Sequence, residues 1–182
     1  MLGLYRLFAD DTLVVERSLE INNLRSMVNN DLKKNITHWG KQWLVKLTPE
    51  KTEIVYFSTR SYPLDLYFSI DNVKIKPVDG HKHLGVTLSA DCKWSKHMNN
   101  VVVKTSRQIA VLHKIKVKVS RNLLENIYMT LIMPLLEYFC KAWDSCTVAD
   151  AERLEQLQLE AARIVTGLTS YASLPSLYAE TG

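Results

Sequence analysis

The chain has 182 residues, of which 47% are hydrophobic, and it carries a formal net charge of +4. This length and apolar share are enough for one packed domain, or for a domain with a small appendage. No stretch is apolar for long enough to span a bilayer, and the first six residues do not form a secretory signal. Its three cysteines show no paired zinc spacing, so we expect reduced thiols in a cytoplasmic or nuclear protein that is not secreted.

The acidic pair Asp10-Asp11 lies between two short apolar runs, Leu7–Ala9 and Thr12–Val15. Apolar runs of this length, separated by a turn, predict two buried strands in a tight hairpin. Asp-Asp is poor turn chemistry, because tight hairpins favour Asn-Gly or Asp-Gly. Adjacent carboxylates repel each other unless a cation lies between them, and hard divalent cations such as Mg²⁺ take oxygen ligands. The pair therefore predicts either a divalent metal site or a solvated turn.

The first half of the chain is predicted to mix one helix with several strands. Apolar residues at three- and four-residue steps predict a helix from Leu24 to Trp43, with Ser18 or Asn22 as its N-cap. The remaining elements expected here are strands at 54–57, 66–70, 73–75 and 84–88, a loop at 58–64 and a hairpin turn at Asp71-Asn72.

The second half is predicted to be helical throughout. The first helix covers 94–115, because the apolar residues there share one face at about 100° per residue. Ser120 is the predicted N-cap of a second helix that reaches Ile132, and Pro134 interrupts the helical pattern beyond it. The last helix is expected at about 149–165.

Basic residues are concentrated in one part of the chain. Between Lys93 and Arg121 there are eight basic residues and no acid, whereas from Asn122 to the end eight acids accompany three bases. On a helical wheel, four of the basic side chains fall within roughly 80° of one another, opposite the apolar stripe. These four are Lys96, Lys104, Arg107 and Lys114. The stripe predicts contact with nucleic-acid phosphates, the alternative being an ordinary solvated helix face.

Five sequence blocks follow one another in a recognisable order. They are LFADDTLVV at 7–15, WGKQWL at 39–44, LTPEKTE at 47–53, VYFS at 55–58 and KHLGVTL at 82–88. In this order they resemble the active-site hairpin, helix, lysine-bearing loop, strand and primer-grip hairpin of reverse transcriptases from non-LTR (LINE-type) retrotransposons. The resemblance covers nearly the whole chain, and several ordered motifs are more specific than any single one.

This resemblance implies an α+β fold. The C-terminal part of a polymerase palm, with antiparallel strands and a packed helix, would be followed by an all-helical thumb-like bundle. We expect the palm to occupy 1–91 and the thumb-like region 92–182. Only nine residues precede Asp10 and none is acidic, whereas the family carries a further metal-ligand Asp and its fingers upstream. We therefore expect a fragment of an RNA-directed DNA polymerase that lacks the N-terminal half and is inactive alone.

The resemblance also implies roles for individual residues. Asp10 and Asp11 would be the catalytic carboxylates, with Asp10 as the direct ligand of Mg²⁺ or Mn²⁺ in two-metal nucleotidyl transfer. Lys51 would lie near the triphosphate, although a solvated lysine is the simpler alternative. The primer grip would comprise His83, Leu84 and Gly85. The implied partners are an RNA template, a DNA primer and a deoxynucleoside triphosphate. No membrane partner is implied.

Three further expectations concern weaker signals. His81 and His83 alternate along a strand, but two histidines without a third ligand are weak evidence for zinc. Glu53 is expected to contact solvent rather than metal. Trp94 and His97 could contact a sugar or pack in the core.

Two other functions compete with polymerase activity. The first is a non-catalytic nucleic-acid-binding module, and the second is a protein-interaction element that uses the last helix. An apolar heptad extends over only about two repeats there, so packing within a helical bundle is the favoured use. The heptad residues are Leu154, Leu157, Ala161, Ile164 and Leu168.

Overall fold

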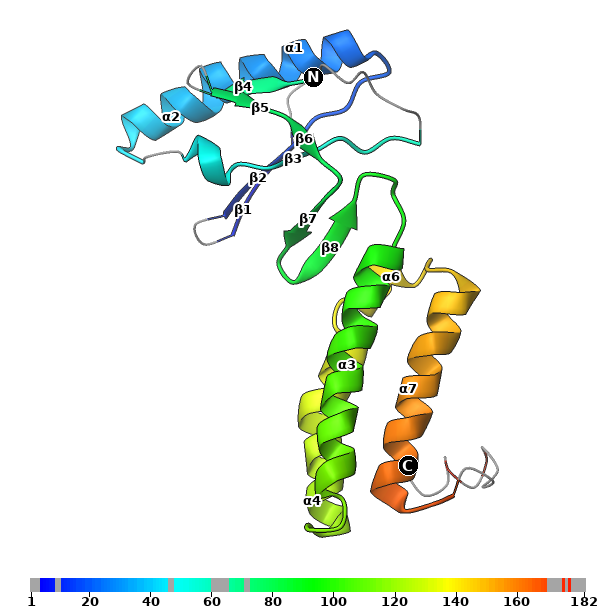
Figure 1. Cartoon of the computed structure of the whole chain (residues 1–182). Coiled ribbons are helices and arrows are strands. Elements are labelled where there is room, and N and C mark those ends of the chain that lie inside the picture. Colours follow the sequence, from blue (N-terminus) through cyan, green and yellow to red (C-terminus); the bar gives the residue numbers. More distant parts are fainter. Residues whose placement is uncertain are drawn as a thin grey trace. The chain divides into compact units, whose positions relative to one another are not determined.

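The computed structural model describes residues 4–8, 11–45, 48–59, 66–70, 73–169, 175 and 177. Helices and short strands are mixed over these residues, which agrees with the predicted α+β class (Figure 1). The chain divides into two compact units, 1–81 and 82–182. The assignment of a palm and a thumb-like domain, with a boundary near Asp91, remains a prediction. Two compact units need not correspond to those two domains.

The described residues of the first unit form three sheets of two strands each. The β1–β2 and β4–β5 pairs are antiparallel, and the β3–β6 pair is parallel. Their bounds are β1 Leu4–Phe8, β2 Asp11–Val15, β3 Ile54–Val55, β4 Phe68–Ile70, β5 Val73–Ile75 and β6 Pro77–Val78. The predicted hairpins around 10–11 and 71–72 are thus present, although Asp10, Asp71 and Asn72 lie outside the described residues. Most of the predicted 58–64 loop also lies outside them.

The predicted long helix of this unit is divided into three pieces. They are α1 (Ile21–Asp31), the π-helical turn η1 (Leu32–Ile36) and α2 (Thr37–Gln42). A π turn shifts the hydrogen-bond ladder by one residue. The side chain of Thr37 contributes to the π turn, because its Oγ1 donates to the carbonyl of Leu32 at 2.8 Å.

The predicted cap of this helix is wrong. The N-cap is Glu20, which makes no side-chain capping hydrogen bond, so neither Ser18 nor Asn22 caps α1. Ser18 Oγ instead accepts a hydrogen bond from the backbone N–H of Glu20 at 3.2 Å, which orders the approach to the helix.

The core of the first unit lies between the α1–η1 segment and the β4–β5 pair. The backbone N–H of Ser69 in β4 donates to Asn29 Oδ1 in α1 at 2.9 Å, which fixes the helix on the strand. The buried apolar residues are Leu32, Leu66, Phe68, Ile70 and Ile75.

The second unit is mainly helical, as predicted. Ser120 caps its second helix, because Ser120 Oγ accepts from the backbone N–H of Leu123. A π turn lies just before Pro134, where a proline removes a backbone donor from the ladder. The helices are α3 Ser95–Ile115, α4 Arg121–Ile127, η3 Tyr128–Ile132, α5 Met133–Glu137, α6 Cys140–Trp143 and α7 Val148–Thr166.

A fourth sheet joins β7 (Gly80–His83) to β8 (Val86–Ser89), and the division between the units falls within β7. The strand predicted at 84–88 therefore begins later than expected. Leu84 and Gly85 have φ angles of 45° and 88°, which belong to a tight turn and not to a strand.

Asp150 joins the N-terminal ends of α3 and α7. Its side chain is buried and accepts hydrogen bonds from Thr147 Oγ1 at 2.9 Å and from Ser95 Oγ at 3.0 Å. Thr147 Oγ1 in turn accepts from the backbone N–H of Asp150, so it caps α7. The carboxylate thus has partners for both oxygens, since Arg153 lies 3.3 Å from Oδ1.

The core of the second unit is formed mainly by α3, η3 and α7. Met98, Leu112 and Ile132 are fully buried in it. Helix α7 packs beside α3 (Figure 1). Leu154, Ala161 and Ile164 of the heptad also lie in this core, so α7 uses its apolar face within the unit. Among the described residues, no helix combines the length and apolarity needed to cross a membrane.

Candidate functional site

The β1–β2 hairpin presents an acidic side chain at its tip. Asp11 is the first residue of β2, pairs in register with Phe8, and is exposed. The prediction that these strands are buried is wrong, because Leu7 is 67% and Phe8 62% exposed. The hairpin is a two-stranded ribbon, and no third strand covers it within the described residues.

Polar contacts hold the other end of this hairpin. Asn35 Nδ2 in η1 donates to the hydroxyl of Tyr5 at 3.1 Å and to Asp31 Oδ1 at 2.8 Å. Burial raises the pKa of Glu16, just after β2, and a hydrogen bond with Asp31 and its negative charge raise it further. The hairpin is therefore fixed at its open end, while Asp11 at the tip remains accessible.

The described side chains supply only part of the implied metal site. Asp11 has the oxygen donors that Mg²⁺ and Mn²⁺ prefer. Within the described ranges, however, no group of three or more His, Cys, Asp or Glu side chains could hold a metal ion. These residues therefore do not fit a complete divalent metal site, and the role of Asp10 lies outside the described residues.

Lys51 lies at the end of a short 3₁₀ turn, η2 (Pro49–Lys51). The turn begins with a proline, whose fixed φ suits the first helical position. Thr52 Oγ1 donates to the carbonyl of Thr48 at 3.1 Å across the turn, and the Lys51 side chain is exposed. The turn thus presents an accessible cation from a constrained backbone, and its place beside a triphosphate stays a prediction.

Glu53 has a protein partner that the sequence did not reveal. Its Oε2 lies 2.6 Å from His81 Nδ1, whereas the expectation of solvent rather than metal named no protein partner. The two residues are 28 positions apart, and no local pattern links them. The contact occupies one ring nitrogen of His81, which leaves the weak zinc signal without support from the described residues.

The turn after β7 is closed by a tyrosine from the helical part of the same unit. The hydroxyl of Tyr138 donates to the carbonyl of Leu84 at 2.7 Å. A Cβ atom at Gly85 would lie 3.2 Å from Tyr138 Cε1, so the absence of a side chain admits the ring. Gly85 thus accommodates Tyr138, a residue that no sequence pattern singled out, and its role in a primer grip stays a prediction.

Helix α3 carries the predicted basic stripe. The four side chains of the stripe, Lys96, Lys104, Arg107 and Lys114, are all exposed. The opposite face is buried, with Thr105, Ile109 and Leu112 in the core. Since α3 contains no Asp or Glu, its own residues place only positive charge on the exposed face.

His97 belongs to the core rather than to this exposed face. It is 3% exposed, and its Nδ1 accepts a hydrogen bond from the backbone N–H of Thr87 at 3.3 Å. Trp94 packs edge-on against the imidazole, with ring centroids 6.2 Å apart, and its Nε1 donates to Ser145 Oγ at 3.3 Å. The alternative in which His97 contacts a sugar is therefore wrong, because its ring is covered.

The stability of the second unit should fall in mild acid because of His97. Burial lowers the pKa of His97, and the positive charge of Lys104 lowers it further. The folded state thus favours the neutral ring. The contribution of this ring to stability is complete above about 6.5, the pKa of histidine in the unfolded chain. It is lost as the pH falls from there through the lower pKa of the folded state. Unfolding of the chain in urea should show stability falling from pH 7.5 to 5.5, by at most about 1.4 kcal/mol per pH unit from this group.

The matched control for this prediction is His97→Gln, which keeps a hydrogen-bond acceptor but does not titrate. This variant should lose part of the acid sensitivity, whatever its stability at pH 7.5. An identical pH dependence in both proteins would contradict the assignment to His97.

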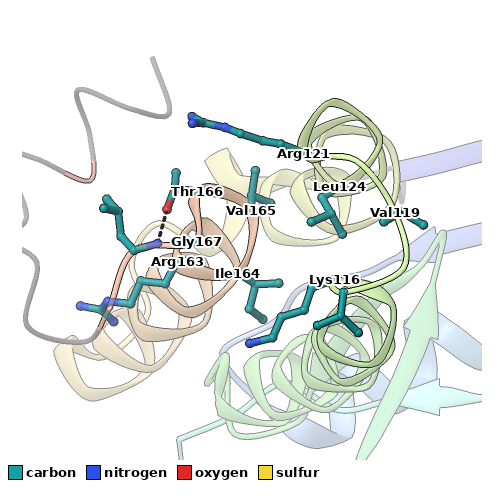
Figure 2. A pocket seen from close by; sticks show the side chains of 11 residues that line it. Lys116, Val119, Arg121, Leu124, Arg163, Ile164, Val165, Thr166 and Gly167 are labelled. Carbon is teal, nitrogen blue, oxygen red and sulfur yellow. Dashed lines mark hydrogen bonds between the residues drawn. The ribbon is translucent and has the colours of Figure 1, made fainter.

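A cavity of about 370 Å³ lies where the loop between α3 and α4, and the start of α4, meet the end of α7 (Figure 2). Its wall combines apolar side chains with Lys116, Arg121 and Arg163. Gly167, with a φ of 75°, ends α7 here, and its N–H donates to the carbonyl of Arg163 at 2.9 Å. None of the described site candidates lines this cavity.

Comparisons with curated proteins identify the class to which the chain is similar. Its curated relatives are RNA-directed DNA polymerases of mobile elements, which confirms the resemblance to non-LTR reverse transcriptases. No protein-family model matches the chain, and no solved structure matches it significantly.

Three of these relatives come from Drosophila melanogaster. The chain is 26% identical over 164 residues to a probable RNA-directed DNA polymerase from transposon X-element, covering 88% of this chain and 18% of the relative. It is 25% identical to the enzyme from mobile element jockey, covering 90% and 18%, and 21% identical to a probable one from transposon BS, covering 94% and 19%. The chain therefore spans less than a fifth of the length of the curated relatives it matches.

Proposed function

We propose that this chain is the part of an RNA-directed DNA polymerase that contains the end of the palm and a thumb-like helical region. The supporting observation is its similarity, over 88% to 94% of its length, to polymerases of three mobile elements. The whole enzyme would transfer deoxynucleotides to a DNA primer paired with an RNA template.

Within that enzyme, the acidic pair of the hairpin and the lysine of the η2 turn would act on the nucleotide. Asp10 and Asp11 would contribute carboxylate oxygens to a divalent metal site that other parts of the enzyme complete. Lys51, exposed on a constrained turn, would neutralise negative charge on the triphosphate, because phosphoryl transfer depends on stabilising that charge. His83, Leu84 and Gly85 would contact the primer strand.

The second unit would hold the primer–template duplex by its backbone. The basic stripe of α3 presents four cations on one exposed face, and phosphate contacts of this kind give affinity without sequence preference. Nucleic-acid binding without synthesis is the second candidate function, because the stripe is complete within the described residues. The protein-interaction alternative is less favoured, since α7 already packs its apolar face in the core.

The isolated 182-residue chain should give no primer extension. It spans less than a fifth of its polymerase relatives, and its described residues assemble no group of metal ligands. The assay is extension of a labelled DNA primer on an RNA template with deoxynucleotides and Mg²⁺ or Mn²⁺. Asp11→Ala should match the wild type at background level.

Robust extension that disappears in Asp10→Ala would contradict the prediction and show that the chain has a working site. The polymerase proposal itself is tested by duplex binding of the wild-type chain. It requires an affinity that falls as the salt concentration rises, and a chain that binds no duplex at low salt would overturn it.

A further inference from the structure

Phe139 adopts a backbone conformation that its side chain disfavours. Its φ and ψ angles are 57° and 27°, in the left-handed region, and its side chain is 58% exposed. Tyr138, at −56° and 119°, precedes it, and the two pairs of angles are close to those of a type II turn. Glycine or asparagine is favoured at the position that Phe139 holds, and a bulky residue there is an outlier. Burial does not offset this strain, so the exposed ring calls for another explanation.

Contacts within the second unit fix the backbone that carries this ring. The indole Nε1 of Trp143 donates to the carbonyl of Tyr138 at 2.9 Å. The hydroxyl of Tyr138 donates to the carbonyl of Leu84, and its ring packs against Gly85. Tyr138 is therefore held at both its backbone and its hydroxyl, and Phe139 follows directly from this anchored residue.

The result is a pair of exposed aromatic rings beside the β7–β8 turn. The ring centroids of Tyr138 and Phe139 are 6.2 Å apart with an interplanar angle of 34°, and Tyr138 is 52% exposed. Exposed Lys82 lies two residues before Leu84 of the turn, and exposed Lys141 lies two residues after Phe139, while the exposed acids Asp79, Glu137 and Asp144 are also near in sequence to the turn or the pair. Aromatic faces with nearby cations are the features that bind unpaired nucleic-acid strands, in which bases stack on rings.

We infer that Phe139 is a stacking platform for an unpaired nucleic-acid base at the β7–β8 turn, and that Tyr138 positions it. This inference rests on the proposed function and extends it from the duplex backbone to a base at a strand end. Stacking is tolerant of sequence, because every base has a π face. The site would therefore recognise an unpaired end without selecting its sequence.

The test compares two duplexes that differ only in bases. Both carry a single-stranded overhang of the same length, one with adenines and one with abasic sugars, so that the phosphate contacts are equal. Fluorescence anisotropy should show that the wild-type chain prefers the adenine overhang by roughly 5- to 100-fold. Phe139→Leu should lose this preference, because leucine keeps an apolar side chain in the same conformation but has no π face. Phe139→Trp should retain the preference.

A fourth protein, Phe139→Gly, separates stacking from folding. Glycine adopts the left-handed conformation without strain, so this variant should melt a few degrees higher than the wild type while losing the preference. Equal preference in the wild type, Phe139→Leu and Phe139→Gly would overturn the inference while duplex binding still supports the proposed function. Absence of any duplex binding by the wild-type chain would overturn both the inference and the proposed function.

Discussion

Replacing Leu112 by alanine is expected to lower the free energy of unfolding of the second unit by about 3–5 kcal/mol. Leu112 is fully buried in α3, in the core that this helix shares with η3 and α7. The loss combines the transfer free energy of the removed carbons with the cost of the cavity, which a well-packed core closes only in part. Urea unfolding followed by far-UV circular dichroism measures it.

The neighbouring residue provides the matched control. Val111 lies on the same helix and is 53% exposed, so Val111→Ala should change the free energy of unfolding by less than about 0.5 kcal/mol. Alanine is the better helix former, which limits any loss at this site. Similar losses in the two variants would mean that the face of α3 assigned to the core is not packed as described.

The elements that the sequence predicted well are those with local signals. The helix expected at 94–115 is observed at Ser95–Ile115, because an apolar period of 3.6 residues continues over its whole length. The helix expected at about 149–165 is observed at Val148–Thr166, and Ser120 caps α4 as predicted. A capping side chain and its backbone donor are three residues apart, so such a motif is visible in the sequence.

Features that depend on distant partners were not predictable in this way. The hydrogen bond from Tyr138 to Leu84 joins residues 54 positions apart, and no period relates them. The π turns η1 and η3 depend on one-residue shifts in the hydrogen-bond ladder that apolar spacing does not reveal. The exposure of β1 and β2 was missed because an apolar run does not specify what covers it.

The candidate site shows the same division. The basic stripe could be derived from a helical wheel because its four members belong to one helix, and the structure presents all of them to solvent. The contact between Glu53 and His81 brings separate elements together, so only the fold reveals it. Gly85 could be named from the sequence only as part of the implied primer grip, whereas its neighbour, Tyr138, needed the structure.

Replacing Lys104, Arg107 and Lys114 together by alanine is expected to weaken duplex binding and to reduce its dependence on salt. Each phosphate that a cation neutralises releases condensed counterions, so a plot of log K against log salt concentration has a slope set by the number of contacts. Removing about three contacts should lower the magnitude of that slope by roughly two to three units. If the two proteins bind equally at about 1 M salt, this corresponds at 0.1 M salt to an affinity loss of roughly a hundred- to a thousandfold. Fluorescence anisotropy with an RNA–DNA duplex at several salt concentrations measures both quantities.

A second triple variant separates the stripe from the net charge of the chain. Lys33, Lys34 and Lys41 are exposed in the first unit, and their replacement by alanine removes the same formal charge. The control variant should keep most of the salt dependence, since these lysines do not belong to the α3 face. Surface alanines favour helix formation, so circular dichroism should show both variants folded. Equal losses in the two variants would show that the chain binds duplex through its general positive charge, and unchanged binding in the α3 variant would leave the stripe as a solvated helix face.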